Sequence, residues 1–403
     1  MTLKGFLKSG HTPTLVAAFL YFDMSFMVWV LLGAIGVAVA KDLHLNAAQK
    51  GLMVAVPVLA GALIRAVNGV AVDHLGPKRV GVVCQLIVIA GLIAAWALGV
   101  HDLTQVFVLG AVLGVAGSSF AVALPLASRW YPPEHQGLAL GIAGAGNSGT
   151  VLASLFAPAL AVAMGWRTVI GLAAIPLALV LVLFVALAKD SPAQPAPKSL
   201  TDYLSVLRVP DAWWLMLFYG VTFGGFVGLS SSLTIYFNGE YHLPAVTAGF
   251  FTAACVFAGS FLRPVGGAVA DRIGGVRTLT FVYVVAAAAL AVVSFPLGSP
   301  WWAELVLIVA MGALGMGNGA IFQLAPQRFG KEIGVMTGLV GMTGGIGGFY
   351  LASSLGLSKQ FTGSYQLGFL GFALLAVFAV LSLTGIKQHW RAGWGALAAT
   401  ARV

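Results

Sequence analysis

The chain is 403 residues long, and its composition excludes a water-soluble globular domain. Hydrophobic residues make up 60% of the chain and charged residues only 8%, whereas roughly 25% charged residues are usual in soluble domains. The formal charge of +9 does not indicate nucleic-acid binding, because the basic residues form no stripe with interleaved aromatic residues. Repeated apolar runs of about 20 residues match the length that crosses ~30 Å of hydrocarbon. We therefore predict a multi-pass protein of the cell (inner) membrane.

In chain order, a short basic end precedes twelve apolar segments. Lys4 and Lys8 lie before an apolar run that is too long for the core of a signal peptide and has no small-residue cleavage site, so we expect no cleaved leader. We expect membrane helices at residues 14–40, 48–71, 80–100, 103–129, 137–163, 167–188, 211–238, 245–270, 278–297, 302–327, 332–357 and 363–386.

Basic residues are distributed unequally between the connections of these helices. The chain ends and the even-numbered connections hold fifteen lysines and arginines, whereas the odd-numbered connections hold only four, namely Lys41, Lys50, Arg167 and Lys359. Cytoplasmic loops carry an excess of Lys and Arg, so this bias places both termini in the cytoplasm and agrees with an even number of helices.

A polar, proline-containing segment at residues 189–210 divides the helices into two sets, because its four prolines cannot continue a membrane helix. We predict an N-terminal six-helix bundle at residues 1–188, a cytoplasmic linker at 189–210, a C-terminal six-helix bundle at 211–386 and a cytoplasmic tail at 387–403.

The two halves also repeat in sequence. Six residues of the first half recur 198 positions later: Arg65, Val67, Gly69, Asp73, Gly76 and Arg79 match Arg263, Val265, Gly267, Asp271, Gly274 and Arg277. Parallel repeats of six helices are typical of transporters whose halves rock about a site near the bilayer midplane. The repeat therefore predicts an all-α transporter.

The segment GVAVDHLGPKR at residues 69–79, with its second copy, resembles the loop motif of the major facilitator superfamily. The resemblance implies that superfamily's fold of twelve helices in two bundles. An aspartate at a helix end can pair with basic groups or with a neighbouring helix N-terminus. We expect a cytoplasmic latch formed by Asp73, Arg79, Asp271 and Arg277, the alternative being ordinary solvated loop charges.

Two arginines, Arg65 and Arg263, fall inside predicted helices. Each precedes the motif aspartate by eight residues, which places it ~12 Å inside the cytoplasmic helix end. A guanidinium at such depth costs at least ~2.5 kcal/mol and is expected to face a cavity. Asp23 is the only acidic residue clearly within a span, so a small anion would complete the charge balance. The planar donor fork of arginine suits a planar oxyanion. The alternative to anion binding is a structural role, in which each arginine pairs with a carboxylate and only joins helices.

Other residues share the depth of the two arginines. Counting from the cytoplasmic helix ends gives about 12–18 Å for Phe120, Asn147, Tyr219, Phe223 and Asn318. Asparagine amides can donate hydrogen bonds to an anion, and aromatic rings can wall a narrow path. Ordinary helix packing is the alternative for each phenylalanine. Asp23, near the midplane, is a candidate proton carrier, with a permanent ion pair to one of the arginines as its alternative.

Helices five and eleven contain the glycine-rich segments GIAGAGNSG (141–149) and GLVGMTGGIGG (338–348). Small residues at one-turn spacing let membrane helices approach closely. The glycine density exceeds the need of one packing face, so we also expect flexibility for alternating access at Gly141, Gly144, Gly146, Gly149, Gly338, Gly341, Gly344 and Gly345.

These paired segments resemble the signatures of the nitrate/nitrite porter family within the superfamily. The similarity extends to FDMSFMVWVLLGAIG, RWYPPEHQG, FYGVTFGGFVG, SFLRPVGG and GNGAIFQL. The resemblance implies a carrier of nitrate and nitrite. It further implies that the arginines bind the anion, that Asn147 and Tyr219 donate hydrogen bonds, and that Phe120 and Phe223 enclose it.

The membrane potential opposes anion entry by about 2.3 kcal/mol per charge per 100 mV, so uptake needs compensation. The short loops and chain length resemble the proton-coupled branch of the family, and we expect nitrate–proton symport. Nitrate/nitrite antiport, carriage of another small anion such as formate, and a nitrate-binding membrane sensor are the alternatives.

An enzyme is excluded at this stage because the seven histidines fall at helix ends or in loops without ligand-like spacing. Cys84 and Cys255 lie in apolar runs and indicate neither a disulfide framework nor a metal site. We expect no metal or cofactor, no nucleic-acid partner and a monomer in the bilayer that binds its anion and exchanges protons.

Overall fold

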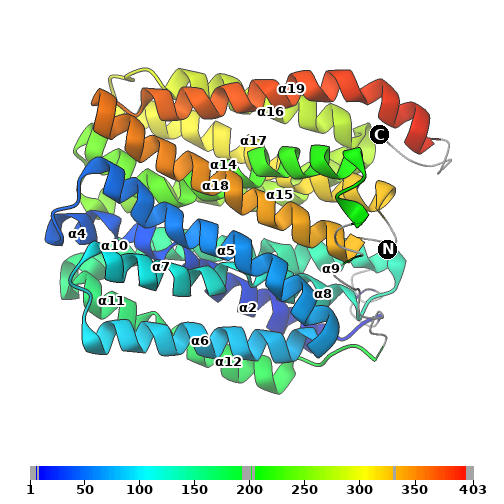
Figure 1. Cartoon of the computed structure of the whole chain (residues 1–403), viewed down its shortest axis with the longest axis horizontal. Helices are drawn as coiled ribbons and strands as arrows, with labels where there is room; N and C mark the ends of the chain where they lie inside the picture. The colour runs from blue at the N-terminus through cyan, green and yellow to red at the C-terminus, as the bar shows by residue number, and fades with distance from the viewer. Residues whose placement is uncertain (1–5, 7–8, 193–200, 202–204, 330–332, 396–403) are drawn as a thin grey trace.

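The computed structural model describes residues 6, 9–192, 201, 205–329 and 333–395. Its helices run roughly parallel to one long axis, and the described residues begin and end at the same end of the bundle (Figure 1). In the described ranges, twelve segments are long and apolar enough to cross a membrane, as the sequence predicts.

The N-terminal half contains several membrane spans that are broken into shorter helices. The elements of this half are α2 (Thr12–Trp29), α3 (Leu31–Ala34), α4 (Gly36–Asp42), α5 (Ala47–Leu75), α6 (Pro77–Leu98), α7 (Leu103–Gly117), α8 (Phe120–Ser128), α9 (Pro133–Gly144), the 3₁₀ segment η1 (Ala145–Ser148), α10 (Gly149–Met164), α11 (Trp166–Leu172) and α12 (Ala174–Leu187). The sequence predicts the spans but not these interruptions.

The C-terminal half is built from longer, continuous helices. They are α14 (Pro210–Tyr241), α15 (Ala245–Ile273), α16 (Gly275–Val293), α17 (Pro300–Arg328), α18 (Ile333–Thr362) and α19 (Gln366–Gly395). In Figure 1, this half lies above the N-terminal half, and α5 runs beside α18 where the two halves meet. Helices α10 and α15 form the second packed pair across the interface.

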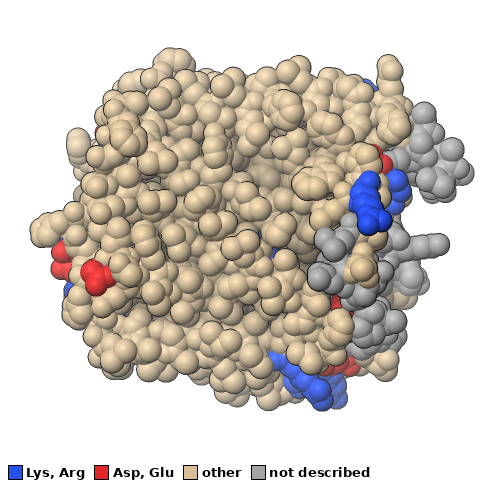
Figure 2. All heavy atoms as spheres, viewed as in Figure 1, with Lys and Arg blue, Asp and Glu red and all other residues tan. Residues whose placement is uncertain are grey.

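The molecular surface has the charge distribution of a membrane-spanning protein. The face in Figure 2 is an almost uncharged belt, and the charged side chains gather at its two ends. Large apolar side chains of the membrane-spanning helices are also exposed, including Leu98, Phe281 and Val182, each more than 60% exposed. In a bilayer these side chains contact lipid, which explains their exposure.

At the extracytoplasmic end, the two halves pack backbone against backbone. A side chain added at Gly51 of α5 would lie 2.8 Å from the Gly356 Cα of α18. One added at Gly249 of α15 would lie 2.6 Å from the Ser154 carbonyl oxygen of α10. Open space, by contrast, surrounds Gly338 in the cytoplasmic part of α18. The structure is therefore closed on the extracytoplasmic side.

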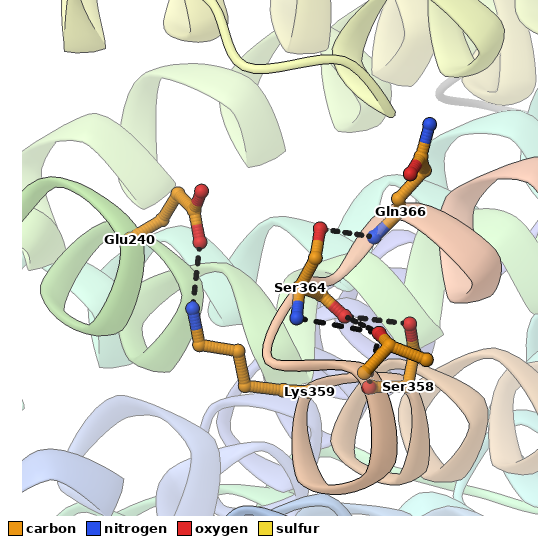
Figure 3. Close-up of polar contacts among 6 residues, drawn as sticks. Glu240, Ser358, Lys359, Ser364 and Gln366 are labelled. Carbon is orange, nitrogen blue, oxygen red and sulfur yellow. Dashed lines mark hydrogen bonds and ion pairs between the residues drawn. The ribbon is translucent and has the colours of Figure 1, made fainter.

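Polar contacts also fix the helix ends on that side. Lys359 of α18 forms an ion pair with Glu240 of α14 at 2.9 Å, and Ser358 donates to the Ser364 carbonyl oxygen at 2.7 Å (Figure 3). The Ala47 N–H at the start of α5 donates to the Gln360 side chain at 3.1 Å. This last contact crosses from one half to the other.

At the cytoplasmic end, Asp73 of the first loop motif forms an ion pair with Arg129 at 2.7 Å. The sequence predicts latch contacts for this aspartate but does not identify Arg129 as the partner. Arg79, Asp271 and Arg277 are exposed at the same end, and their latch role remains a prediction.

The last helix continues to Gly395, beyond residue 386 where the sequence analysis ends it. Trp390 in this extension is fully buried, and its indole N–H donates to the Asp211 carboxylate at 2.8 Å. The same carboxylate accepts from Arg328 Nε at 2.6 Å. The extension is therefore anchored to the start of α14.

Candidate anion site

Arg65 of α5 lies in the middle of the bundle and is 1% exposed. Its Nε donates to the Gly117 carbonyl oxygen at 2.9 Å, and its Nη1 donates to the Gly341 carbonyl oxygen at 2.9 Å. Gly117 ends α7, and the Ala121 N–H beyond it donates to Ser118 at 2.9 Å. The break between α7 and α8 thus leaves the Gly117 carbonyl available to orient the guanidinium.

Four aromatic rings surround the Arg65 guanidinium. The centroids of Trp29, Phe223, Phe120 and Phe26 lie 4.9, 5.0, 5.5 and 5.8 Å from its central carbon. Ring faces attract a cation within ~6 Å, and more strongly when the contact is desolvated. The rings therefore offset part of the burial cost of the charge without neutralising it.

Arg263 of α15, the repeat counterpart of Arg65, is 7% exposed. Its guanidinium lies 5.8 Å from the Phe120 ring centroid and 5.7 Å from that of Phe322. Phe120 thus contacts both arginines. The two guanidinium groups lie close enough to repel each other electrostatically, and the Tyr219 hydroxyl is within electrostatic reach of both.

Neither arginine forms an ion pair with a carboxylate in the described part of the chain. The ion pairs under 4 Å found there involve other residues. Each guanidinium also keeps one buried nitrogen without a hydrogen-bond acceptor among these residues, namely Arg65 Nη2 and Arg263 Nη1. A buried cation without a counter-ion is strongly destabilising. The arrangement therefore favours the uptake of an anion between the arginines over a purely structural role.

The three predicted polar neighbours are fully buried. Both amide atoms of Asn147 and both of Asn318 make no hydrogen bond among the described residues, and the Tyr219 hydroxyl lies beside the Arg263 guanidinium. Buried polar groups are normally paired, so several unpaired ones at a similar depth indicate a place for water or a small polar ligand. No hydrogen bond joins Asn318 to either guanidinium in the described chain, and its assignment rests on depth and on these unpaired atoms.

Phe223 and Tyr219 form one wall of the site. They lie one turn apart on α14, and their rings stack at 5.1 Å with an interplanar angle of 4°. The Phe322 ring meets the Tyr219 ring edge-on, with the two centroids 5.3 Å apart. Its centroid also lies 5.8 Å from that of Phe120. Aromatic side chains from α8, α14 and α17 thus surround the arginines, and the role of Phe120 and Phe223 in enclosing an anion stays a prediction.

The 3₁₀ segment η1 positions Asn147 and the candidate proton carrier. A 3₁₀ stretch inside a helix often marks a functional hinge. Asn147 lies in η1, which packs against α15, the helix that carries Arg263. The next residue, Ser148, donates to the Asp23 carboxylate at 2.7 Å. Asp23 is 6% exposed and forms no ion pair with Arg65 or Arg263, which argues against a permanent salt bridge.

The glycine-rich helices approach the site closely. A side chain at Gly344 would lie 2.8 Å from the rings of Phe223 and Tyr219, and one at Gly341 would lie 3.6 Å from Arg65 and Phe120. On the other helix, one at Gly144 would lie 3.9 Å from the Arg263 guanidinium. Gly146 and Gly149 face α2 around Asp23, and Gly345 contacts Ala62 of α5. Open space surrounds Gly141 and Gly338.

Three aromatic residues at the site, Phe26, Trp29 and Phe322, were not predicted individually. Phe26 and Trp29 are three residues apart, a spacing that places them on one face of α2. Trp29 also donates from Nε1 to the Pro57 carbonyl oxygen at 2.8 Å, which holds its ring beside Arg65. The spacing alone could suggest a shared face, but not that the face is turned toward an arginine.

Comparison with known proteins shows which family the chain belongs to. The family model described as Major Facilitator Superfamily matches residues 17–352. The chain is 31% identical over 368 residues to the "Nitrite extrusion protein" of Bacillus subtilis, with 91% of each chain covered. It is 32% identical to the "Probable nitrate/nitrite antiporter NarK1" of Thermus thermophilus, covering 90% of this chain and 88% of that protein.

Solved structures agree at the level of the fold. A bacterial homologue of the human lysosomal transporter Spinster, in an inward-facing and occupied conformation, superposes with a TM-score of 0.71. The identity is 16%, and the match covers 93% of this chain and 96% of that one. At this identity, the likeness supports the architecture alone.

Proposed function

The chain belongs to the major facilitator superfamily, and from this premise we propose that it carries nitrate and nitrite across the cell membrane by alternating access. The membership already makes the chain a membrane transporter rather than an enzyme. The observation that carries the choice of an anion is the pair of buried guanidinium groups. Each has an unpaired nitrogen, and neither forms an ion pair with a carboxylate among the described residues.

The size of the proposed substrate follows from the packing of the site. Asn147, Asn318 and Tyr219 are 0% exposed, so no room for a large solute surrounds them. A small planar oxyanion needs the least displacement of the rings, and it can accept from guanidinium, amide and phenol donors together. Phe120 and Phe223 are proposed to enclose it from two sides.

We also propose proton symport, with Asp23 as the proton carrier. Asp23 is buried beside the hinge segment η1, and its carboxylate is bound by the neutral Ser148 hydroxyl rather than by a basic group. A carboxylate in such a setting can gain and lose a proton without breaking an ion pair. Movement of more than one proton with each nitrate would overcome the opposing membrane potential.

Flux measurements on purified protein in proteoliposomes test the proposal. We expect nitrate-driven nitrite flux and nitrate uptake in the parent protein. Arg65→Lys and Arg263→Lys should each lower these fluxes about tenfold to a hundredfold, because one charge-assisted hydrogen bond is worth roughly 1.5–3 kcal/mol. Arg167→Lys is the matched control, since Arg167 pairs with Asp42 at the extracytoplasmic surface.

The possible results of these flux measurements lead to different conclusions. Absence of nitrate and nitrite flux in a folded, reconstituted parent protein would defeat the assignment of these substrates. Full activity in both site variants would remove the arginines from the substrate site. Competition by formate as strong as by nitrite would widen the substrate class to small monovalent anions in general.

A further inference from the structure

A small, mostly apolar cavity with a few polar groups lies between the two halves, at the extracytoplasmic end and apart from the arginine pair. Its volume of about 20 Å³ is room for roughly one water molecule. Its lining comes from α5, α14, α18 and the connection between α18 and α19, and it includes Lys50, Ser232 and Tyr365. Because both halves contribute, separation of the halves at this end would widen it.

Lys50 is a cation whose charge is not balanced within the described chain. Two other extracytoplasmic cations are neutralised: Arg167 pairs with Asp42 at 2.8 Å, and Lys359 pairs with Glu240 at 2.9 Å (Figure 3). No ion pair under 4 Å involves Lys50 among the residues described. The pairing of Glu240 also reduces the repulsion that this carboxylate would exert on an anion nearby.

The stability of the fold gives no reason for a lysine at this position. Lys50 lies in the first turn of α5, which contains no acidic residue. The helix dipole makes a cation there unfavourable by about 0.3–1 kcal/mol. The general distribution of Lys and Arg also disfavours the extracytoplasmic side. A positive potential at this spot is therefore better explained by a ligand than by folding.

Two hydroxyl groups accompany the lysine. Ser232 is 6% exposed, and its hydroxyl has no hydrogen-bond partner among the described residues. Tyr365 lies in the connection between α18 and α19, where burial and the Glu240 carboxylate raise its pKa to about 12. Its phenol is therefore neutral at physiological pH. An ammonium group with neutral hydroxyl donors is suited to a small anion.

The position of Lys50 relative to Arg65 links this cavity to the anion site. Both residues lie on α5, fifteen positions apart, which corresponds to ~22 Å along the helix and ~60° around it. Between them, α5 faces α18 continuously: Gly51 meets Gly356, and Ala62 meets Gly345. The lysine and the arginine thus lie at the outer end and the middle of one inter-half seam.

We propose that Lys50 and Ser232 form an extracytoplasmic recruitment site for the small monovalent oxyanion that Arg65 and Arg263 bind. This inference rests on the proposed nitrate and nitrite transport. The anion binds first at Lys50 when the halves separate at this end, and then moves along the seam to the arginines. Closure of the seam reduces the cavity to the size seen in the structure.

The test uses right-side-out membrane vesicles that contain the full-length protein, with initial nitrate uptake measured against external nitrate. Lys50→Gln should raise the half-saturating external concentration about threefold to tenfold, because it removes electrostatic steering. The maximal rate should not change. The effect should shrink between ~10 mM and ~150 mM ionic strength, as the Debye length falls from about 30 to 8 Å.

Two further variants separate a specific site from diffuse surface charge. Ser232→Ala should raise the half-saturating concentration about twofold or more, through loss of one hydrogen bond. Lys41→Gln, which removes an exposed cation from α4 on the same side, should leave it unchanged. Lys50→Arg should restore most of the affinity for external nitrate.

Three results would overturn the inference. They are an unchanged half-saturating concentration in Lys50→Gln, an equal shift in Lys41→Gln, and an equal change for nitrate supplied from the cytoplasmic side. If the proposed nitrate transport itself is wrong, the result is different: the parent protein would show no nitrate uptake in the same vesicles.

Discussion

Arg65 of the N-terminal half donates a hydrogen bond from Nη1 to the Gly341 carbonyl oxygen of the C-terminal half, at 2.9 Å. The contact joins residues 276 positions apart in the chain and lies at the centre of the α5–α18 seam. A residue proposed to bind the anion is thus also an inter-half contact. If the proposed anion binds at Arg65, its binding would act directly on the interface that must open and close during transport.

The close approach of α18 to the aromatic wall predicts a sharp contrast between two glycine substitutions. Gly344→Ala would place a methyl group 2.8 Å from the Phe223 and Tyr219 rings. Overpacking of this kind costs about 1–3 kcal/mol, so we expect nitrate flux to fall by about fivefold or more. Initial flux per reconstituted transporter is the measurement.

Gly338→Ala is the matched control on the same helix, since open space surrounds Gly338. Both substitutions give the same gain in helix propensity, about 1 kcal/mol relative to glycine. A difference in flux therefore reports packing at the site. Equal activity of the two variants would show that the rings yield without functional consequence.

Trp29 is predicted to position Arg65 through its own hydrogen bond. Trp29→Phe keeps an aromatic ring near the guanidinium but removes the Nε1 donor to Pro57, which lies at 2.8 Å. Loss of one neutral hydrogen bond, about 0.5–1.5 kcal/mol, should raise the half-saturating nitrate concentration about twofold to tenfold. Trp302→Phe, at a position 63% exposed to lipid or solvent, should not change it.

If Trp29→Phe keeps the half-saturating nitrate concentration of the parent protein, the role of Trp29 is packing alone. A loss of maximal rate without a change in half-saturating concentration would place its effect on the opening and closing of the halves instead.

Much of the architecture can be predicted from the sequence. Hydropathy locates the membrane spans, the charge of the loops gives their side of the membrane, and the repeat gives the correspondence between the two halves. Twelve apolar segments give the spans, and the 198-residue repeat pairs Arg65 with Arg263. The breaks at Ser118 and within η1 are different, because a few small and polar residues inside a long apolar segment do not by themselves fix where a helix is interrupted. Their positions depend on hydrogen bonds to other helices, such as that from Arg65 to Gly117.

The site was predictable in its charges and depth, but not in its contacts. An arginine in a membrane helix is recognisable from its insertion cost alone. Which carbonyl or ring it meets depends on helices far away in the chain, so Gly341 appears in the sequence only as a small residue. The same holds for Ser148, whose hydrogen bond to Asp23 requires that η1 lie beside α2.

The anchoring of the last helix predicts a stability effect at the cytoplasmic end. Trp390→Phe removes the hydrogen bond to the Asp211 carboxylate, which also accepts from Arg328. Hydrogen bonds to charged groups contribute about 1.5–3 kcal/mol, so the free energy of unfolding should fall by that amount. The thermal midpoint in detergent measures the effect, with Trp302→Phe as the exposed control; equal midpoints would refute the anchoring role.

Asp23 gives the prediction that decides between symport and exchange. Asp23→Asn is nearly isosteric and retains an acceptor for the Ser148 hydroxyl, which donates to Asp23 at 2.7 Å, but it cannot change its charge. We expect nitrate-induced proton movement and proton-driven nitrate accumulation to be lost, while nitrate/nitrite exchange continues. Proteoliposomes with a pH-sensitive dye inside report both processes in one preparation.

Ser148→Ala is the companion variant, because it removes the hydrogen bond but leaves the carboxylate. It should retain proton coupling with an altered dependence on pH. Unchanged proton coupling in Asp23→Asn would exclude this residue as the carrier. Nitrate/nitrite exchange without any proton movement in the parent protein would instead make the chain an antiporter, in which one-for-one exchange moves no net charge against the membrane potential.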